Sequence, residues 1–159
     1  MSPERAPLHD VAASLRAAVA VATPRLRAVS SSEAAKSPDG QGWSRKEILG
    51  HLIDSATNNH QRFVRAQLQG ELRFPGYQQD GWIATQNYTA SDWPLLVDLW
   101  RAYNLHLADV IERIPAAHLK IACTLDEREP VTLQFLAEDY VTHLEHHVQD
   151  MALEARVSG

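Results

Sequence analysis

The stretch SRKEILGHLIDSATNNHQRFVRAQLQG, from Ser44 to Gly70, is the part of the sequence that decides the fold. Its apolar residues recur every three or four positions, which is the pattern of a helix with one buried face. The apolar row consists of Leu49, Leu52, Ile53, Ala56 and Phe63. Ser44 and Glu47 have the spacing of a capping box, and Gly70 is a typical helix-ending residue. The stretch therefore predicts one long amphipathic helix with defined ends.

Three other stretches carry the same helical period. They run from about His9 to Val29, from Ser91 or Asp92 to Ile114, and from about Thr132 to Ala155. Pro24 is expected to kink the first of them. The segments between the helices are rich in Ser, Gly, Pro and Asp, which cap or break helices. The sequence therefore predicts an all-α fold, a four-helix bundle, with residues 1–159 forming a single domain.

The connection between the second and third predicted helices is unusually long. It reads ELRFPGYQQDGWIATQNYTA, from Glu71 to Ala90, whereas adjacent antiparallel helices need only a few linking residues. Its aromatic residues suggest a packed crossover that covers one end of the bundle. A short helix is expected within it, around Trp82 to Gln86.

Composition and charge exclude several classes of function. One cysteine, Cys123, leaves no intramolecular disulfide and favours a cytoplasmic protein. The N-terminus lacks the apolar run of a signal peptide, and no window approaches the roughly 20 apolar residues of a membrane span. The formal charge is −5, with 15 basic residues scattered among 20 acidic ones, so we expect no nucleic-acid partner and no membrane partner.

Two histidines of the last predicted helix have the spacing of a metal-binding pair. His143 and His147 are four residues apart, so their side chains share one helix face. Both fall on or beside the apolar stripe of that helix and are expected to point inward, where a neutral imidazole needs a partner. Such a pair is compatible with a metal ion, and equally with two hydrogen-bonded or exposed histidines.

A polar seam on the second helix bears on this choice. Ser55, Asn58 and Arg62 lie within about 40° of His51 around the helix, beside the apolar row. A metal ion and a bound substrate would supply partners for these groups, although the seam could also be a polar flank at the solvent boundary. Gly50 in the helix interior indicates close approach by a neighbouring backbone.

Three segments resemble the DinB-like superfamily of metal-binding helical bundles, which includes bacillithiol and mycothiol S-transferases. They are GWSRKEILGHLIDSATNNHQRF at Gly42 to Phe63, FPGYQQDGW at Phe74 to Trp82, and DYVTHLEHHVQD at Asp139 to Asp150. In that family one histidine of the second helix and an HxxxH pair of the last helix bind the metal. The resemblance implies that His51, His143 and His147 bind one divalent metal ion.

The resemblance leaves the reaction open. Three imidazoles leave a coordination position free, which suits a metal-dependent hydrolase or a thiol S-transferase acting on a small-molecule substrate. Zinc or nickel is the expected ion, iron or copper are alternatives, and a low-molecular-weight thiol is a possible second cofactor. Gln78 and Gln79 stand where family members often carry acids, so the proton acceptor is not identified, although Asp80 is close in sequence.

Other functional readings follow from the remaining polar residues. Asn58, Asn59 and Arg62 are expected to orient the substrate, with Arg62 clamping a carboxylate or forming an ordinary salt bridge. A non-catalytic metal-binding stress-response module and a helical interaction protein that binds no metal are the alternatives. A homodimer is also expected, from the resemblance and the apolar face left over on a small bundle.

The remaining histidines and the cysteine are given structural roles. His60 lies about 180° from His51 around the helix, and His146 is one residue off the inward pair, so both are expected to be exposed. His106 lies at the edge of an apolar face. Cys123 is expected in a loop without a paired base, and therefore not to act as a nucleophile.

Overall fold

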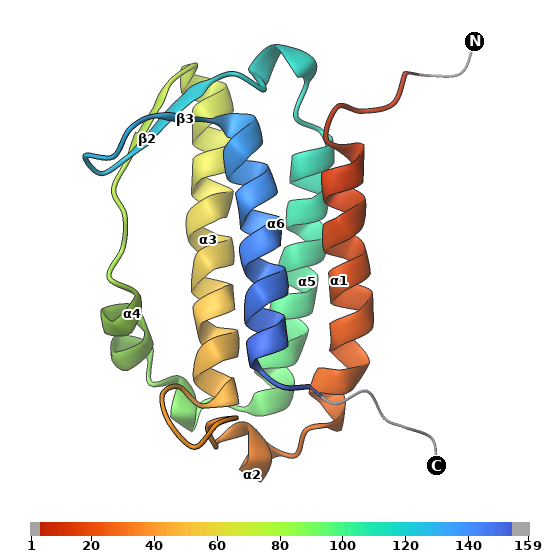
Figure 1. Ribbon diagram of the computed structural model, residues 1–159, viewed down its shortest axis with the longest axis vertical. Helices are drawn as coiled ribbons and strands as arrows, with labels where there is room; N and C mark the ends of the chain where they lie inside the picture. Colours follow the sequence, from red (N-terminus) through yellow and green to blue (C-terminus); the bar gives the residue numbers. More distant parts are fainter. Residues whose placement is uncertain (1–3, 154–159) are drawn as a thin grey trace.

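The computed structural model describes residues 4–153 and shows a bundle of four long helices (Figure 1). These helices are α1 (His9–Ala28), α3 (Arg45–Gln69), α5 (Trp93–Glu112) and α6 (Leu133–Asp150). The predicted four-helix bundle is confirmed. The shorter elements are α2 (Ser31–Ala34), α4 (Gln79–Gln86), and the 3-10 turns η1 (Tyr88–Ala90) and η2 (Ala116–His118).

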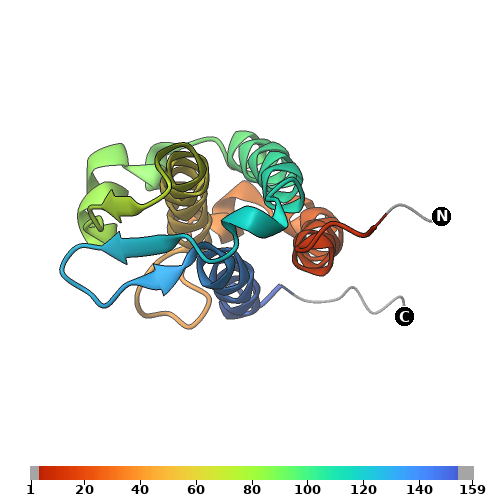
Figure 2. The same ribbon diagram turned by 90° about the horizontal axis from the view of Figure 1, so that it is seen from above.

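The chain direction of the helices explains the long crossover. In Figure 1, α3 and α5 run in the same direction, whereas α1 and α6 run in the opposite direction. Two consecutive parallel helices require a connection that returns along their length. The segment between α3 and α5 makes this return on the outside of α3, and α4 lies within it (Figures 1 and 2).

The ends of the helices follow the predicted capping residues. At the start of α3, the Ser44 side chain accepts from the amide of Glu47, and the Glu47 carboxylate accepts from the amide of Ser44. Gly70 ends α3 with a left-handed φ of 76°. Thr132 caps α6, which ends at Asp150, so the predicted end near Ala155 is too late; Ala155 itself lies outside the described residues.

A small three-stranded sheet, which the sequence did not predict, lies at one end of the helical bundle. Strand β1 (Leu72–Phe74) pairs in parallel with β2 (Ala122–Leu125), and β2 pairs antiparallel with β3 (Val131–Thr132). Cys123 therefore lies in a strand and not in the predicted loop. The sheet joins the start of the crossover to the connection between α5 and α6 (Figure 2).

The core fills the space between the four long helices. Its largest fully buried side chains include Trp100 of α5, Phe63 of α3 and Leu15 of α1. Tyr140 of α6 packs its ring edge-on against Phe63, with centroids 6.0 Å apart. Across residues 4–153 we find no helix whose length and apolar character would allow it to cross a membrane.

Candidate metal centre and adjoining pockets

His51 is the most buried of the predicted metal ligands. It lies in the second turn of α3 and is only 4% exposed. Its Nδ1 atom is buried without a hydrogen-bond partner among the described residues. Burial, together with the neighbouring His147 and His143, lowers the pKa of His51 to about 4. The ring is therefore neutral at neutral pH and carries a nitrogen that lacks a partner.

The ring of His147 lies directly beside that of His51. Their centroids are 4.7 Å apart, and the His143 centroid is 5.9 Å from that of His147. The arrangement follows from the fold, because α3 begins and α6 ends at the same end of the bundle (Figure 1). Burial, with a further contribution from His143, lowers the pKa of His147. Two neutral rings from different helices thus meet in the interior.

His143 departs from the prediction that both histidines of α6 point inward. His147 is half-buried, whereas His143 is exposed. The Nδ1 atom of His147 lies 3.8 Å from a carboxylate oxygen of Asp150. Among residues 4–153, no three His, Cys, Asp or Glu side chains are arranged so that they could hold an ion as they stand. The structure brings the three rings together without forming a ready coordination shell.

The donor set nevertheless fits a divalent ion. Imidazole is a preferred ligand of zinc, nickel and copper, and it must be neutral to bind them. His51 meets this requirement, and its unpartnered buried Nδ1 atom is unusual for a polar atom in a protein interior. The negative charge of Asp80 in α4 acts in the opposite direction and raises the pKa of His51, by less than burial lowers it.

A small pocket of about 240 Å³ extends from His143 along α3. Asn59 and Arg62, two of the three residues expected to orient a substrate, line it. Arg62 is only 8% exposed, its Nε atom is buried and has no hydrogen-bond partner among the described residues, and its guanidinium lies 5.8 Å from the centroid of the Phe74 ring. Burial lowers the pKa of Arg62, but a guanidinium stays charged at neutral pH. The pocket therefore presents a buried cation that can receive an anionic group.

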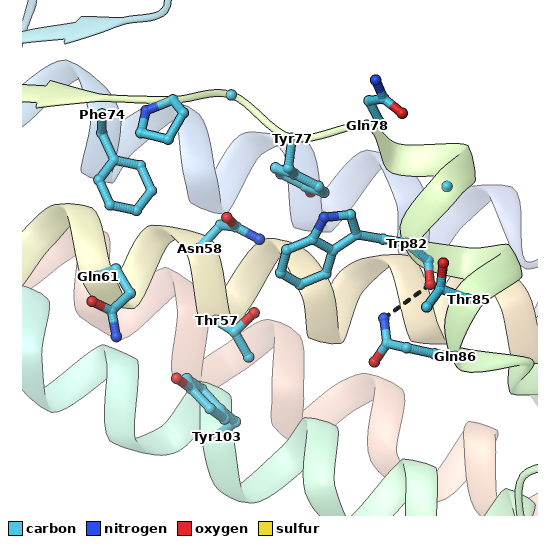
Figure 3. A pocket seen from close by; sticks show the side chains of 13 residues that line it. Thr57, Asn58, Gln61, Phe74, Tyr77, Gln78, Trp82, Thr85, Gln86 and Tyr103 are labelled. Atoms are coloured by element: carbon cyan, nitrogen blue, oxygen red, sulfur yellow. Dashed lines mark hydrogen bonds between the residues drawn. The ribbon is translucent and has the colours of Figure 1, made fainter.

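Asn58 does not join this pocket. Its Nδ2 atom donates to the carbonyl oxygen of Asp54 at 2.9 Å, and its side chain lines a larger pocket of about 960 Å³ (Figure 3). Gly76 and Tyr77 of the crossover line both pockets and so form a shared wall. The three residues predicted to orient one substrate are divided between two pockets.

Asp54 is a buried acid that the sequence analysis did not identify. It is 2% exposed, and its Oδ1 atom accepts from the Tyr88 hydroxyl at 2.6 Å and from Gln86 Nε2 at 2.8 Å. Its Oδ2 atom has no partner among the described residues, and burial raises its pKa. Its position four residues before Asn58, at the edge of the polar seam, was the available signal. Asp54 holds the end of the crossover against α3.

Gly50 allows this attachment. A Cβ atom on Gly50 would lie 2.2 Å from Cδ2 of the Tyr88 ring. The close neighbour is therefore an aromatic side chain and not the backbone that the sequence suggested. Tyr88 can reach Asp54 only because position 50 carries no side chain.

Two further predictions concern residues outside the triad. The prediction that His60 is exposed is wrong. His60 is half-buried, because Tyr103 of α5 covers it and its Nδ1 lies 2.7 Å from the Tyr103 hydroxyl. His106, also of α5, has its ring 5.3 Å from that of His60. His146 is exposed as predicted. Burial raises the pKa of the Cys123 thiol to about 11, which agrees with the prediction that it is no nucleophile.

Comparison with known proteins identifies a family and a shared architecture. The family model of the DinB superfamily matches residues 14–151. Among solved structures, YfiT from Bacillus subtilis has a TM-score of 0.80 and 19% sequence identity, covering 96% of this chain and 88% of that chain. That protein is described as a probable metal-dependent hydrolase with an unusual four-helix bundle topology. At this identity the likeness is one of fold. None of the curated protein sequences matches the chain.

Proposed function

Because the chain belongs to the DinB superfamily, we propose that it is a metal-dependent hydrolase of a small anionic molecule, with His51, His143 and His147 holding a divalent ion. The observation that carries this proposal is the buried Nδ1 atom of His51, which has no partner among the described residues although the His147 ring lies beside it. A divalent ion would supply the partner that this buried nitrogen lacks. The fold that the chain shares with YfiT agrees with this proposal.

A divalent ion held by His51, His143 and His147 would supply Lewis acidity for hydrolysis, by lowering the pKa of a water molecule. Zinc or nickel suits a histidine-only donor set. Asp80 is our candidate for the proton acceptor, because its charge acts on His51 and because Gln78 and Gln79 cannot accept a proton. Asp80 lies in the first turn of α4, which the crossover places beside α3.

Arg62 and Asn59 would hold the substrate in this scheme. The guanidinium can form two parallel hydrogen bonds to a carboxylate, and the pocket of about 240 Å³ runs from Arg62 to His143. The same geometry supports a second candidate, thiol S-transfer. A low-molecular-weight thiol with a carboxylate would be anchored by Arg62, and an ion held by the histidines would favour the thiolate form of its sulfur.

Metal analysis of protein purified without a histidine tag tests the proposed centre. We expect about one divalent ion per chain in the unmodified protein and a large loss in His147→Ala. His146→Ala is the matched control, because His146 is the adjacent residue of α6 and is exposed. Circular dichroism should show that both variants remain helical. Equal metal content in His147→Ala and the unmodified protein would contradict the proposal.

Activity assays separate the proposed reactions. The metal-loaded protein is tested for hydrolysis of small carboxylate-bearing esters and amides, and for conjugation of thiols to chlorobimane. Turnover that depends on both the ion and Arg62 supports an enzyme. Full metal loading without either activity would favour the alternative, a metal-binding stress-response module without turnover.

The setting of the protein is part of the proposal. We place the protein in the cytoplasm and propose that it forms a homodimer. We expect no nucleic-acid partner, because its charge is −5 and its basic residues are scattered among acidic ones. Salt-resistant, sequence-selective retention of a DNA duplex would contradict this assignment. Sedimentation analysis would measure the oligomeric state.

A further inference from the structure

The larger of the two pockets described above is not explained by the proposed hydrolysis. It lies between α3, the crossover and α5, has a volume of about 960 Å³, and includes none of the three proposed metal ligands (Figure 3). This volume is within the range of pockets that bind small molecules, roughly 300–1,000 Å³. We refer to it as the crossover pocket.

Aromatic side chains form much of the wall of the crossover pocket. Phe74 and Tyr77 come from the crossover, Trp82 projects from α4 over α3, and Tyr103 comes from α5 (Figure 3). The rings of Tyr77 and Trp82 meet edge to face with centroids 5.2 Å apart. Such rings can stack on or contact the edge of another planar ring. The wall is therefore suited to an aromatic ligand.

The charge of the pocket limits the ligand further. No Asp, Glu, Lys, Arg or His lines it among the described residues. Burial raises the pKa of both Tyr77 and Tyr103, so both phenols are neutral at neutral pH. Bringing a charged group into a pocket without an opposite charge is costly. The charged side chains Arg62, Arg128, Asp126 and Asp139 line the small pocket on the other side of Tyr77.

Polar groups in the crossover pocket are neutral amides and hydroxyls. Thr57 and Asn58 both donate to the carbonyl oxygen of Asp54, which leaves the amide oxygen of Asn58 free to accept a hydrogen bond. Gln61 and Thr85 add further donors and acceptors to the wall. A few placed polar groups within an apolar wall are typical of small-molecule sites.

From the aromatic wall and the absence of charged lining residues, we propose that the crossover pocket binds an uncharged aromatic compound. The site is separate from the proposed metal centre. It does not depend on the ion, because none of the proposed ligands contributes to its wall. A compound bound there would contact Tyr77, whose other side faces the pocket of Arg62 and His143.

Titration with Nile red, a planar uncharged dye that fluoresces in apolar surroundings, tests this proposal. The unmodified protein should bind one dye per chain, and removal of metal with a chelator should leave the affinity unchanged. Thr57→Phe, which places a ring inside the pocket, should abolish saturable binding. Trp82→Ala, at a partly exposed position that tolerates truncation, should weaken binding by about tenfold through loss of a ring contact.

Two controls separate the crossover pocket from other apolar surface. Ala17→Phe adds the same ring to the groove between α1 and α6 and should leave dye binding unchanged. The anionic dye anilinonaphthalene sulfonate should bind much more weakly than Nile red. Unchanged Nile red binding in Trp82→Ala, or equal loss in Ala17→Phe, would overturn the proposal even if Thr57→Phe failed to fold. Loss of binding on chelation would overturn the independence of the two sites.

Discussion

Replacing Gly50 with alanine should destabilise the protein, although alanine is the better helix former. In an unconstrained helix interior the change would stabilise by about 1 kcal/mol. Here the new Cβ atom would lie 2.2 Å from Cδ2 and 2.5 Å from Cγ of Tyr88. These atoms belong to the rigid part of the ring near its attachment, so a rotation of the side-chain end cannot relieve the contact.

The magnitude follows from what Tyr88 would lose by moving. The ring is 6% exposed, and its hydroxyl donates to the buried carboxylate of Asp54 at 2.6 Å. Loss of a hydrogen bond to a charged group costs about 1.5–3 kcal/mol, and overpacking adds about 1–3 kcal/mol. After the gain in helix propensity is subtracted, the free energy of unfolding should fall by about 1.5–5 kcal/mol. For a chain of this size the melting temperature should fall by roughly 3–20 °C.

Chemical and thermal denaturation followed by circular dichroism measure this effect. Gly81→Ala in α4 is the matched control, because its Cβ atom would meet only ordinary contacts, the nearest at 3.5 Å. The control should be neutral or slightly stabilising. In a Tyr88→Ala background, Gly50→Ala should also become neutral or stabilising, because the ring is gone. A stabilised Gly50→Ala in the otherwise unmodified protein would refute the reasoning.

Two further predictions concern buried charges of α3. Because burial raises the pKa of Asp54 in the folded state, stability should fall as pH rises from its ordinary pKa through the raised one, and stay level above it. Asp54→Asn removes the titrating group but keeps an oxygen that can accept from Tyr88. The difference in unfolding free energy between this variant and the unmodified protein should therefore change with pH over that range. If the two curves of unfolding free energy against pH are parallel, Asp54 is not the titrating group. Arg62→Lys should retain fold and metal but lower kcat/KM by about tenfold, because an ammonium loses the paired hydrogen bonds. Arg65→Lys, at an exposed position of the same helix, is its control, and a lowered melting temperature with unchanged kinetics would show that Arg62 is only structural.

The four helices could be predicted because their signals are local. The apolar period and the residues that cap the helices lie within each segment, as the reciprocal bonds of Ser44 and Glu47 show. The sheet was missed because its strands have two to four residues and pair across distant parts of the chain. Leu72 is opposite Cys123, and no local pattern encodes that register. Long-range pairing of short strands is visible only in three dimensions.

The candidate site was predictable to a smaller extent. Helical spacing placed His51, Asn58 and Arg62 along one side of α3, where His51 faces α6 and Arg62 lines the pocket that reaches His143, whereas Asn58 lines the crossover pocket. Spacing alone did not show that His143 is exposed and His147 half-buried, because that difference depends on what packs against each turn of α6. For the same reason His60 is covered: Tyr103 of α5 reaches it from a neighbouring helix.

The direction of the helices and the position of the pockets have a common cause. Since α3 and α5 are parallel, the chain must return along α3, and this return places Tyr77 over the helix face that carries Asn58 and Arg62. Gly76 and Tyr77 then separate the pocket that contains the buried Arg62 from a pocket that no charged side chain lines among the described residues. Asp54 and Gly50 fix the far end of the return by receiving Tyr88. A substitution that frees Tyr88 should therefore alter both pockets together, although Tyr88, Asp54 and Gly50 line neither of them.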